Sequence, residues 1–160
     1  MAKDMNIGAL RTNCFRQSKV KGEYMLQMRV PAGLIEAKYL GFVQHLATTY
    51  GDGTFHFGSR QCFAIPGIKY ENIDKVNKEL KDYLEDIEVA QCGVDMDTSA
   101  GYPTIGARNI MACIGGIHCI KANINTQEIA KKIEKEVFPS HYHIKVAVAG
   151  CPNDCAKGHF

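Results

Sequence analysis

Four of the seven cysteines form two short motifs near the end of the chain. Cys113 and Cys119 have five residues between them, Cys151 and Cys155 have three, and 31 residues separate the two pairs. Each pair follows an apolar stretch and lies in a segment with glycine or proline, which allows a tight loop. Four thiolates on two such loops are the ligand set of a [4Fe–4S] cluster.

Two other interpretations of these cysteines have to be weighed. A structural zinc site favours pairs with two to four residues between the ligands, which suits the second pair, whereas the first pair is wide for zinc. Free cysteines are also often simply buried in a core. The two glycine- or proline-shaped loops favour the cluster. Cys14, Cys62 and Cys92 show no such pairing, and we expect them to be small buried side chains.

Composition limits the class of protein. The chain has 160 residues, a hydrophobic fraction of 46% and a net charge of +2, as expected for globular structure without a general affinity for nucleic acid. No apolar stretch is long enough to predict a membrane span, and the start lacks the apolar core of a signal peptide. An odd number of cysteines without a secretion signal argues against a disulfide framework. The expected location is the cytoplasm.

The first part of the chain, residues 1–94, reads as alternating strands and helices. Apolar residues that alternate predict strands, and apolar residues three and four apart predict helices. The resulting order is β-α-β-β-α-β, which is a ferredoxin-like arrangement. The expected elements are a strand at 23–30, a helix at 34–50, strands at 54–59 and 61–67, a helix at 71–84 and a strand at 87–92.

The second part, residues 95–160, carries the cysteine motifs. It opens with a polar linker at 95–103, followed by an extended stretch at 107–113. Asn125 can cap a helix at 126–137, and the apolar stretch 144–150 predicts a strand. We therefore expect an α+β chain: a ferredoxin-like half-domain followed by part of an α/β domain.

Three stretches resemble one known family. MACIGGIHC and AGCPNDCAKG are similar to the cluster motifs of the siroheme-containing sulfite and nitrite reductases, and GSRQCFAIPGI resembles the N-terminal half-domain of that family. The resemblance implies that Cys113, Cys119, Cys151 and Cys155 hold a [4Fe–4S] cluster and that Cys155 also bridges to the iron of siroheme. It implies a six-electron reduction of sulfite to sulfide, with nitrite as the alternative substrate.

The same resemblance implies cationic site residues. Siroheme carries carboxylates and the substrate is an anion, so arginine and lysine are the side chains that such a pocket requires. Arg60 and Arg108 match family positions that reach siroheme or substrate, and Lys145 matches a lysine of some members. A second lysine position holds His143 here, and the roles of His143 and Lys157 stay open.

The chain departs from the family pattern in two ways. Many members carry the half-domain and the cluster domain twice and continue well past the last cysteine, so the resemblance implies that the second domain is incomplete here. A full site would then need a homo-oligomer or a multi-subunit complex, with an electron-donor subunit or ferredoxin-like module. The other hypotheses are a cluster-only electron carrier without siroheme, and a zinc or metal-free interaction domain.

Overall fold

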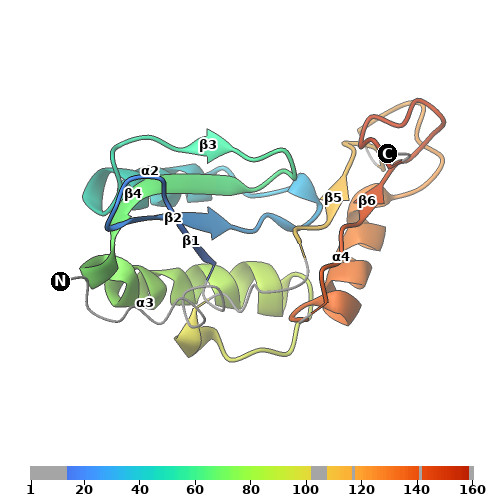
Figure 1. The fold of residues 1–160 in the computed structure, drawn as a ribbon. Helices are drawn as coiled ribbons and strands as arrows, with labels where there is room; N and C mark the ends of the chain where they lie inside the picture. The colour runs from blue at the N-terminus through green and yellow to red at the C-terminus, as the bar shows by residue number, and fades with distance from the viewer. Residues whose placement is uncertain (1–13, 102–107, 117, 141, 159–160) are drawn as a thin grey trace.

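The computed structural model describes residues 14–101, 108–116, 118–140 and 142–158, which form two lobes joined side by side (Figure 1). The larger lobe holds a four-stranded antiparallel sheet in the order β1-β2-β4-β3. Its strands are β1 (Phe15–Gln17), β2 (Glu23–Met28), β3 (His56–Phe57) and β4 (Phe63–Lys69).

Two twelve-residue helices complete the core of the larger lobe. They are α2 (Lys38–Thr49) and α3 (Ile73–Leu84), and α3 runs beneath the sheet in Figure 1. Alternate residues of β2 are buried, as a strand with one covered face requires. Leu26 of β2, Leu46 of α2 and Leu80 of α3 are all fully buried in this one core.

The last expected strand of the half-domain is wrong. Residues 87–92 do not return to the sheet, because the chain continues from α3 as a π-helical segment, η3 (Glu85–Ala90). The buried positions explain why: Leu80, Leu84 and Ile87 keep the spacing of three to four of a helix face. The fourth strand is β1, from the opposite end of the half-domain. Three short 3-10 turns are η1 (Pro31–Gly33), η2 (Tyr70–Asn72) and η4 (Thr98–Ala100).

The smaller lobe consists of a parallel pair of strands and one helix. β5 (Met111–Ala112) pairs with β6 (Ala147–Val148), and α4 (Thr126–Val137) packs beside them. The predicted cap of α4 is confirmed, because the Asn125 side chain accepts a hydrogen bond from the Glu128 N–H at 3.2 Å. Both strands are shorter than the sequence predicted.

A buried arginine joins the two lobes. Arg29 follows β2, is only 4% exposed, and donates from Nε to Oε1 of Glu134 on α4 at 2.9 Å, with a second bond from Nη2 to the same oxygen. Glu88 of η3 lies on the same guanidinium, with Oε1 3.4 Å from Nε. Both carboxyl groups are fully buried.

One cation facing two buried carboxyl groups leaves an excess negative charge unless one carboxyl is protonated. Burial raises the pKa of Glu88 well above its usual value, and the neighbouring Glu134 raises it further, against the opposing effect of Arg29. Glu134 accepts the guanidinium hydrogen bonds, so the structure favours a neutral Glu88 beside an Arg29–Glu134 ion pair.

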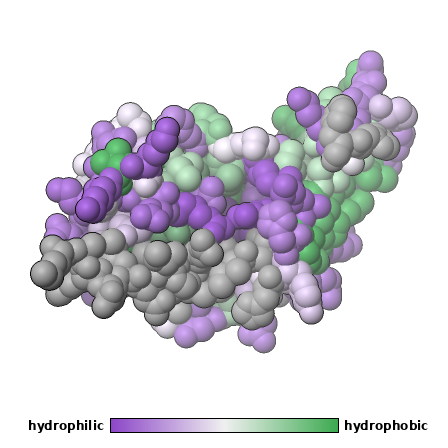
Figure 2. All heavy atoms as spheres, in the orientation of Figure 1, coloured by the Kyte–Doolittle hydropathy of each residue, from purple (hydrophilic) through white to green (hydrophobic). Residues whose placement is uncertain are grey.

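The surface of the molecule has regions of different polarity. Figure 2 shows hydrophilic side chains gathered across the middle of the molecule, and hydrophobic ones along the smaller lobe, over α4 and β6.

Among the described residues, no helix combines the length and apolar character needed to cross a membrane.

The neutral state of Glu88 predicts how stability depends on pH. The folded protein binds the Glu88 proton more tightly than the unfolded chain, so this group's contribution is complete below pH 4.5 and is lost as pH rises through the raised pKa. Replacing Glu88 with glutamine should therefore flatten the fall of the urea midpoint with rising pH.

Glu71→Gln is the matched control, because Glu71 is exposed on the same lobe. It should leave the pH dependence unchanged. A Glu88→Gln protein that keeps the wild-type slope would show that Glu88 is ionised in the fold.

Candidate functional site

A cleft of about 390 Å³ opens where the two lobes meet. The described residues contain four arginines, and all four line this cleft, whereas none of the described lysines does. They come from β1, the end of β2, the turn before β4 and the approach to β5. These arginines are Arg16, Arg29, Arg60 and Arg108.

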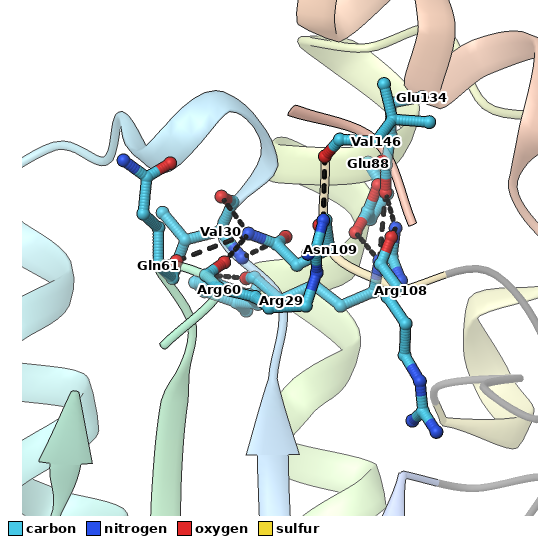
Figure 3. A network of polar contacts seen from close by, with 10 residues as sticks. Arg29, Val30, Arg60, Gln61, Glu88, Arg108, Asn109, Glu134 and Val146 are labelled. Atoms are coloured by element: carbon cyan, nitrogen blue, oxygen red, sulfur yellow. Dashed lines mark hydrogen bonds and ion pairs between the residues drawn. The ribbon is translucent and has the colours of Figure 1, made fainter. Parts of the chain in front are cut away.

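The arginines of the cleft differ in the hydrogen-bond and ion-pair partners of their guanidinium groups. Arg29 is held by its buried carboxyl partners. Arg60 donates to two main-chain carbonyls, from Nη2 to Val146 O at 2.7 Å and from Nε to Asn109 O at 3.2 Å. The side chain of Arg108 extends away from this network in Figure 3. Among the described residues its guanidinium has no hydrogen-bond or ion-pair partner, which leaves it able to bind an anion.

The charges of the cleft act on one another. Burial lowers the pKa of Arg60, and the like charges of Arg108 and Arg29 lower it further. An arginine stays protonated regardless, and the part of the shift that comes from Arg108 and Arg29 is repulsion that a bound anion would relieve. With Arg29 neutralised from behind by Glu134, the remaining cations make the cleft a site for oxyanions or carboxylates.

Asn109 fixes the strand that carries Arg108. Its buried side chain accepts from Val30 N–H at 2.9 Å and donates to Val30 O and Arg60 O, both at 2.8 Å (Figure 3). Each of these bonds crosses between the lobes. The start of β5 is therefore held against the turn that carries Arg60.

Lys145 and His143 lie elsewhere. Both side chains are exposed, and neither lines the arginine cleft. Their neighbours are tied to the site, because Ile144 O accepts from Arg108 N–H at 2.9 Å and Val146 O accepts from Arg60. The structure thus brings Arg60 and Arg108 together in the cleft. Lys145 does not line the cleft, and its role in the site stays a prediction.

The two cysteine loops lie against each other beyond the strand pair. Gly150 N–H donates to Cys113 Sγ at 3.3 Å, and Asn123 N–H donates to Gly150 O at 2.9 Å. A Cβ added to Gly115 or to Gly150 would meet the same three side chains at 3.1 to 3.5 Å. These are Cys113, Ala122 and Thr126. Glycine in each loop permits the close approach.

The loops are together, but the four thiols are not gathered. Cys113, Cys119 and Cys151 are half-buried and Cys155 is exposed. Over the described ranges, no three histidine, cysteine or acidic side chains are close enough to bind one metal ion. Four free thiols on two adjoining loops still fit a [4Fe–4S] cluster by donor chemistry, and a main-chain N–H already donates to one of the sulfurs.

The other three cysteines behave mostly as expected. Cys14 and Cys92 are buried, and burial raises the pKa of Cys92 to about 12, which keeps its thiol protonated. Cys62 is half-buried and lines the arginine cleft with Cys14, although burial raises its pKa as well. Neither Cys62 nor Cys92 has the low pKa of a reactive thiolate.

Several residues of the site were missed at the level of sequence. Arg29 closes the apolar stretch EYMLQM, and an arginine at the end of a buried strand is a signal for a buried ion pair. Glu134 occupies the same helix face as Thr126 and Ala130, four residues apart, and all three are buried. Glu88 carried no signal because the sequence predicted a strand for its segment.

Two family profiles match most of the chain. Residues 16–83 match the nitrite/sulfite reductase ferredoxin-like half domain, and residues 104–160 match the nitrite and sulphite reductase 4Fe-4S domain. The chain is 46% identical over 159 residues to a subunit of the anaerobic sulfite reductase of Salmonella typhimurium. That match covers 98% of this chain and 47% of the Salmonella protein, so the chain spans about half the length of this relative.

More distant relatives agree with this match. The chloroplastic ferredoxin–nitrite reductase of Zea mays is 24% identical, over 87% of this chain and 23% of its own length. The crystal structure of dissimilatory sulfite reductase I shares the fold with a TM-score of 0.64 at 19% identity, over 84% of this chain and 30% of that one.

The contact between the loops predicts the effect of filling it. In Gly150→Ala the new methyl group would lie 3.1 Å from Thr126 Cγ2 and 3.2 Å from Ala122 Cβ. Overpacking of this kind costs about 1–3 kcal/mol. The free energy of unfolding should fall by that amount, and the Asn123 amide should exchange hydrogen faster.

Gly41→Ala is the control, because a Cβ there meets nothing within 4 Å and Gly41 lies inside α2. Alanine in a helix interior should be neutral or stabilising by up to about 1 kcal/mol. Equal stability of the Gly150→Ala protein and wild type would mean that the loops do not pack as described.

Proposed function

The chain belongs to the nitrite and sulfite reductase family, and we propose that it carries the part of a sulfite reductase that binds a [4Fe–4S] cluster and siroheme. The observation that carries this proposal is the concentration of all four described arginines in one cleft, beside a strand that leads into the cysteine loops. The likeness to a sulfite reductase subunit over nearly the whole chain supports sulfite as substrate.

We assign the thiolates of Cys113, Cys119, Cys151 and Cys155 to the cluster. Cys155 is the exposed member of the four, which supports its assignment as the ligand that also reaches the siroheme iron. The Gly150 N–H that donates to Cys113 Sγ would stabilise negative charge on that sulfur. When bound, these cofactors would pass electrons from the donor to the substrate one at a time and would provide the binding site for the oxyanion.

The protein's own part is to bind and to orient. Arg108, with its guanidinium unoccupied by other described residues, would hold a siroheme carboxylate or the substrate oxyanion. Arg60 is anchored to main-chain carbonyls and adds positive charge from a fixed position. Lys145, exposed next to Val146, is proposed as a further cation that contributes once the cofactor extends the site.

Cleft and thiols are separate parts of one site. Arg108 and Cys113 stand five residues apart on an extended segment, roughly 16 Å along the chain. A small anion cannot touch both, whereas a large planar cofactor with carboxylates at its rim can. This distance favours siroheme over a cluster alone.

Partners and location follow from the same proposal. Reduction of sulfite to sulfide takes six electrons, so an electron-donor subunit or ferredoxin-like module has to dock near the cluster. A multi-subunit complex or a homo-oligomer would complete the cofactor pocket. All seven cysteines are free thiols, which suits the reducing cytoplasm.

The test is reduction by protein prepared without oxygen in a siroheme-producing host. We expect siroheme absorption bands, iron with acid-labile sulfide, and viologen-driven conversion of sulfite to sulfide. Arg108→Gln should lower that rate by about 10²–10³, the usual effect of losing one donor to a reacting oxyanion, and should leave the cluster iron in place.

Lys69→Gln is the control, since Lys69 is an exposed cation remote from the cleft. Faster reduction of nitrite than of sulfite would make nitrite the substrate. Iron and sulfide without a haem band would identify an electron carrier, and one zinc per chain without iron would overturn the proposal.

A further inference from the structure

Strand β5, which leads directly to Cys113, has two edges that need hydrogen-bond partners. On one edge, Met111 N–H and Cys113 N–H donate to Val146 O and Val148 O of the β6 segment, both at 3.1 Å. Alternation along a strand turns the main-chain groups of residues 110 and 112 to the opposite edge. The larger lobe covers that edge.

The first partner on this edge is a backbone group. Ala32 N–H of η1 donates to Ile110 O at 3.0 Å. The next position in register is Ala112, which has both an N–H and a C=O to satisfy, and among the described residues no strand lies there to pair with them. Unpaired main-chain groups at a packed junction are costly.

The side chain of Gln61 fills this position. Its Nε2 donates to Ala112 O at 2.8 Å, and its Oε1 accepts from Ala112 N–H at 3.0 Å. A carboxamide has the same donor and acceptor as a peptide unit, so the pair reproduces one step of a β-ladder.

The surroundings of Gln61 accommodate this contact at a cost. Gln61 has φ +56°, the left-handed conformation that glycine adopts without strain. Opposite it, Gly33 has φ +64°, and a Cβ on Gly33 would lie 2.5 Å from Gln61 Oε1. A strained glutamine packed against a glycine indicates that the side chain supplies something that glycine at position 61 would lack.

The Gln61 side chain restrains Ala112, the residue that precedes the proposed cluster ligand Cys113. The carbonyl of Cys113 is held from the other side, by Thr126 Oγ1 and Gln127 Nε2, each at 2.8 Å. With Gln61 on Ala112, both peptide units around the Cys113 Cα are fixed. A fixed ligand backbone orients the thiolate and tunes the metal.

We propose that Gln61 is a positioning residue for Cys113: its carboxamide replaces a missing strand neighbour of β5 and holds the first cluster ligand to the larger lobe. This inference rests on the proposed function in taking Cys113 as a ligand. Gln61 adjoins Arg60 in the same turn, so one turn braces β5 at both ends, at Asn109 through Arg60 and at Ala112 through Gln61.

The test compares Gln61→Gly and Gln61→Glu with wild type. Glycine removes the strain and the carboxamide together, and glutamate keeps the shape but has no N–H to donate. Without cofactor, we expect the Ala112 amide to exchange hydrogen roughly tenfold faster in Gln61→Gly, since about one hydrogen bond's worth of protection is lost. In Gln61→Glu a carboxylate oxygen can still accept from Ala112 N–H, so that variant tests only the lost donation to Ala112 O. Unchanged exchange at Ala112 in Gln61→Gly would overturn the proposal.

The urea midpoint distinguishes a positioning role of Gln61 from a general structural role. Gln61→Gly should keep the urea midpoint of wild type, because relief of strain offsets the lost bonds. Gln44→Glu is the control for charge, as Gln44 is exposed on α2. It should change neither the urea midpoint nor the exchange at Ala112.

The second readout is the reconstituted cluster. We expect both Gln61 variants to bind less iron and sulfide per chain and to show an altered reduction potential and electron paramagnetic resonance spectrum. Wild-type cluster content, potential and spectrum in Gln61→Gly would overturn the proposal. If wild type itself binds no cluster, the proposed function fails, and exchange at Ala112 alone decides whether Gln61 positions Cys113.

Discussion

The contact between Arg29 and Glu134 holds the two lobes in the relation on which the site depends. Arg29 ends a strand of the sheet and Glu134 lies on the helix of the smaller lobe, 105 residues further along the chain. Breaking a buried pair by removing one partner typically costs about 3–5 kcal/mol, because the other charge stays buried alone. The guanidinium also stacks on the Phe138 ring at 4.0 Å and donates to Arg108 O at 3.3 Å.

This position gives Arg29 two effects. Toward the interior it neutralises Glu134 and leaves Glu88 protonated, so that the junction carries no net charge. Toward the cleft its charge is partly compensated by the buried carboxylate, and Arg16, Arg60 and Arg108 are the other cations of the cleft. The cleft therefore has a positive charge, although the charge of its buried Arg29 is partly compensated by Glu134.

Beside the Arg29–Glu134 pair, the junction contains several side chains that bond to main chain. Arg60, Gln61 and Asn109 each satisfy carbonyl or amide groups of the opposite lobe. Hydrophobic contacts also interlock, since Phe138 packs in the core of the larger lobe and Ala32 in that of the smaller. Such directional bonding fixes the angle between lobes more tightly than apolar contact alone, which suits a site with parts on both.

The sequence alone determined the elements whose signal is local. The periodicity of α2 and α3, the cap of α4 at Asn125 and the two cysteine motifs are all properties of short segments, and the structure or the family match bears them out. The cationic positions Arg60 and Arg108 could also be predicted from the sequence, because the motifs around them resemble a known family. The assignments of the ligands, the site roles of Arg60, Arg108 and Lys145, and the boundary between residues 94 and 95 remain predictions.

Only the tertiary structure decided the features that depend on distant partners. Residues 87–90 belong to a helix and not to a strand because Ile87 and Glu88 face a core and an arginine supplied from elsewhere. The pairing of Arg29 with Glu134, and of Gln61 with Ala112, joins residues 105 and 51 positions apart. No pattern within a short segment encodes such a partner, since its identity is set by how the whole chain packs.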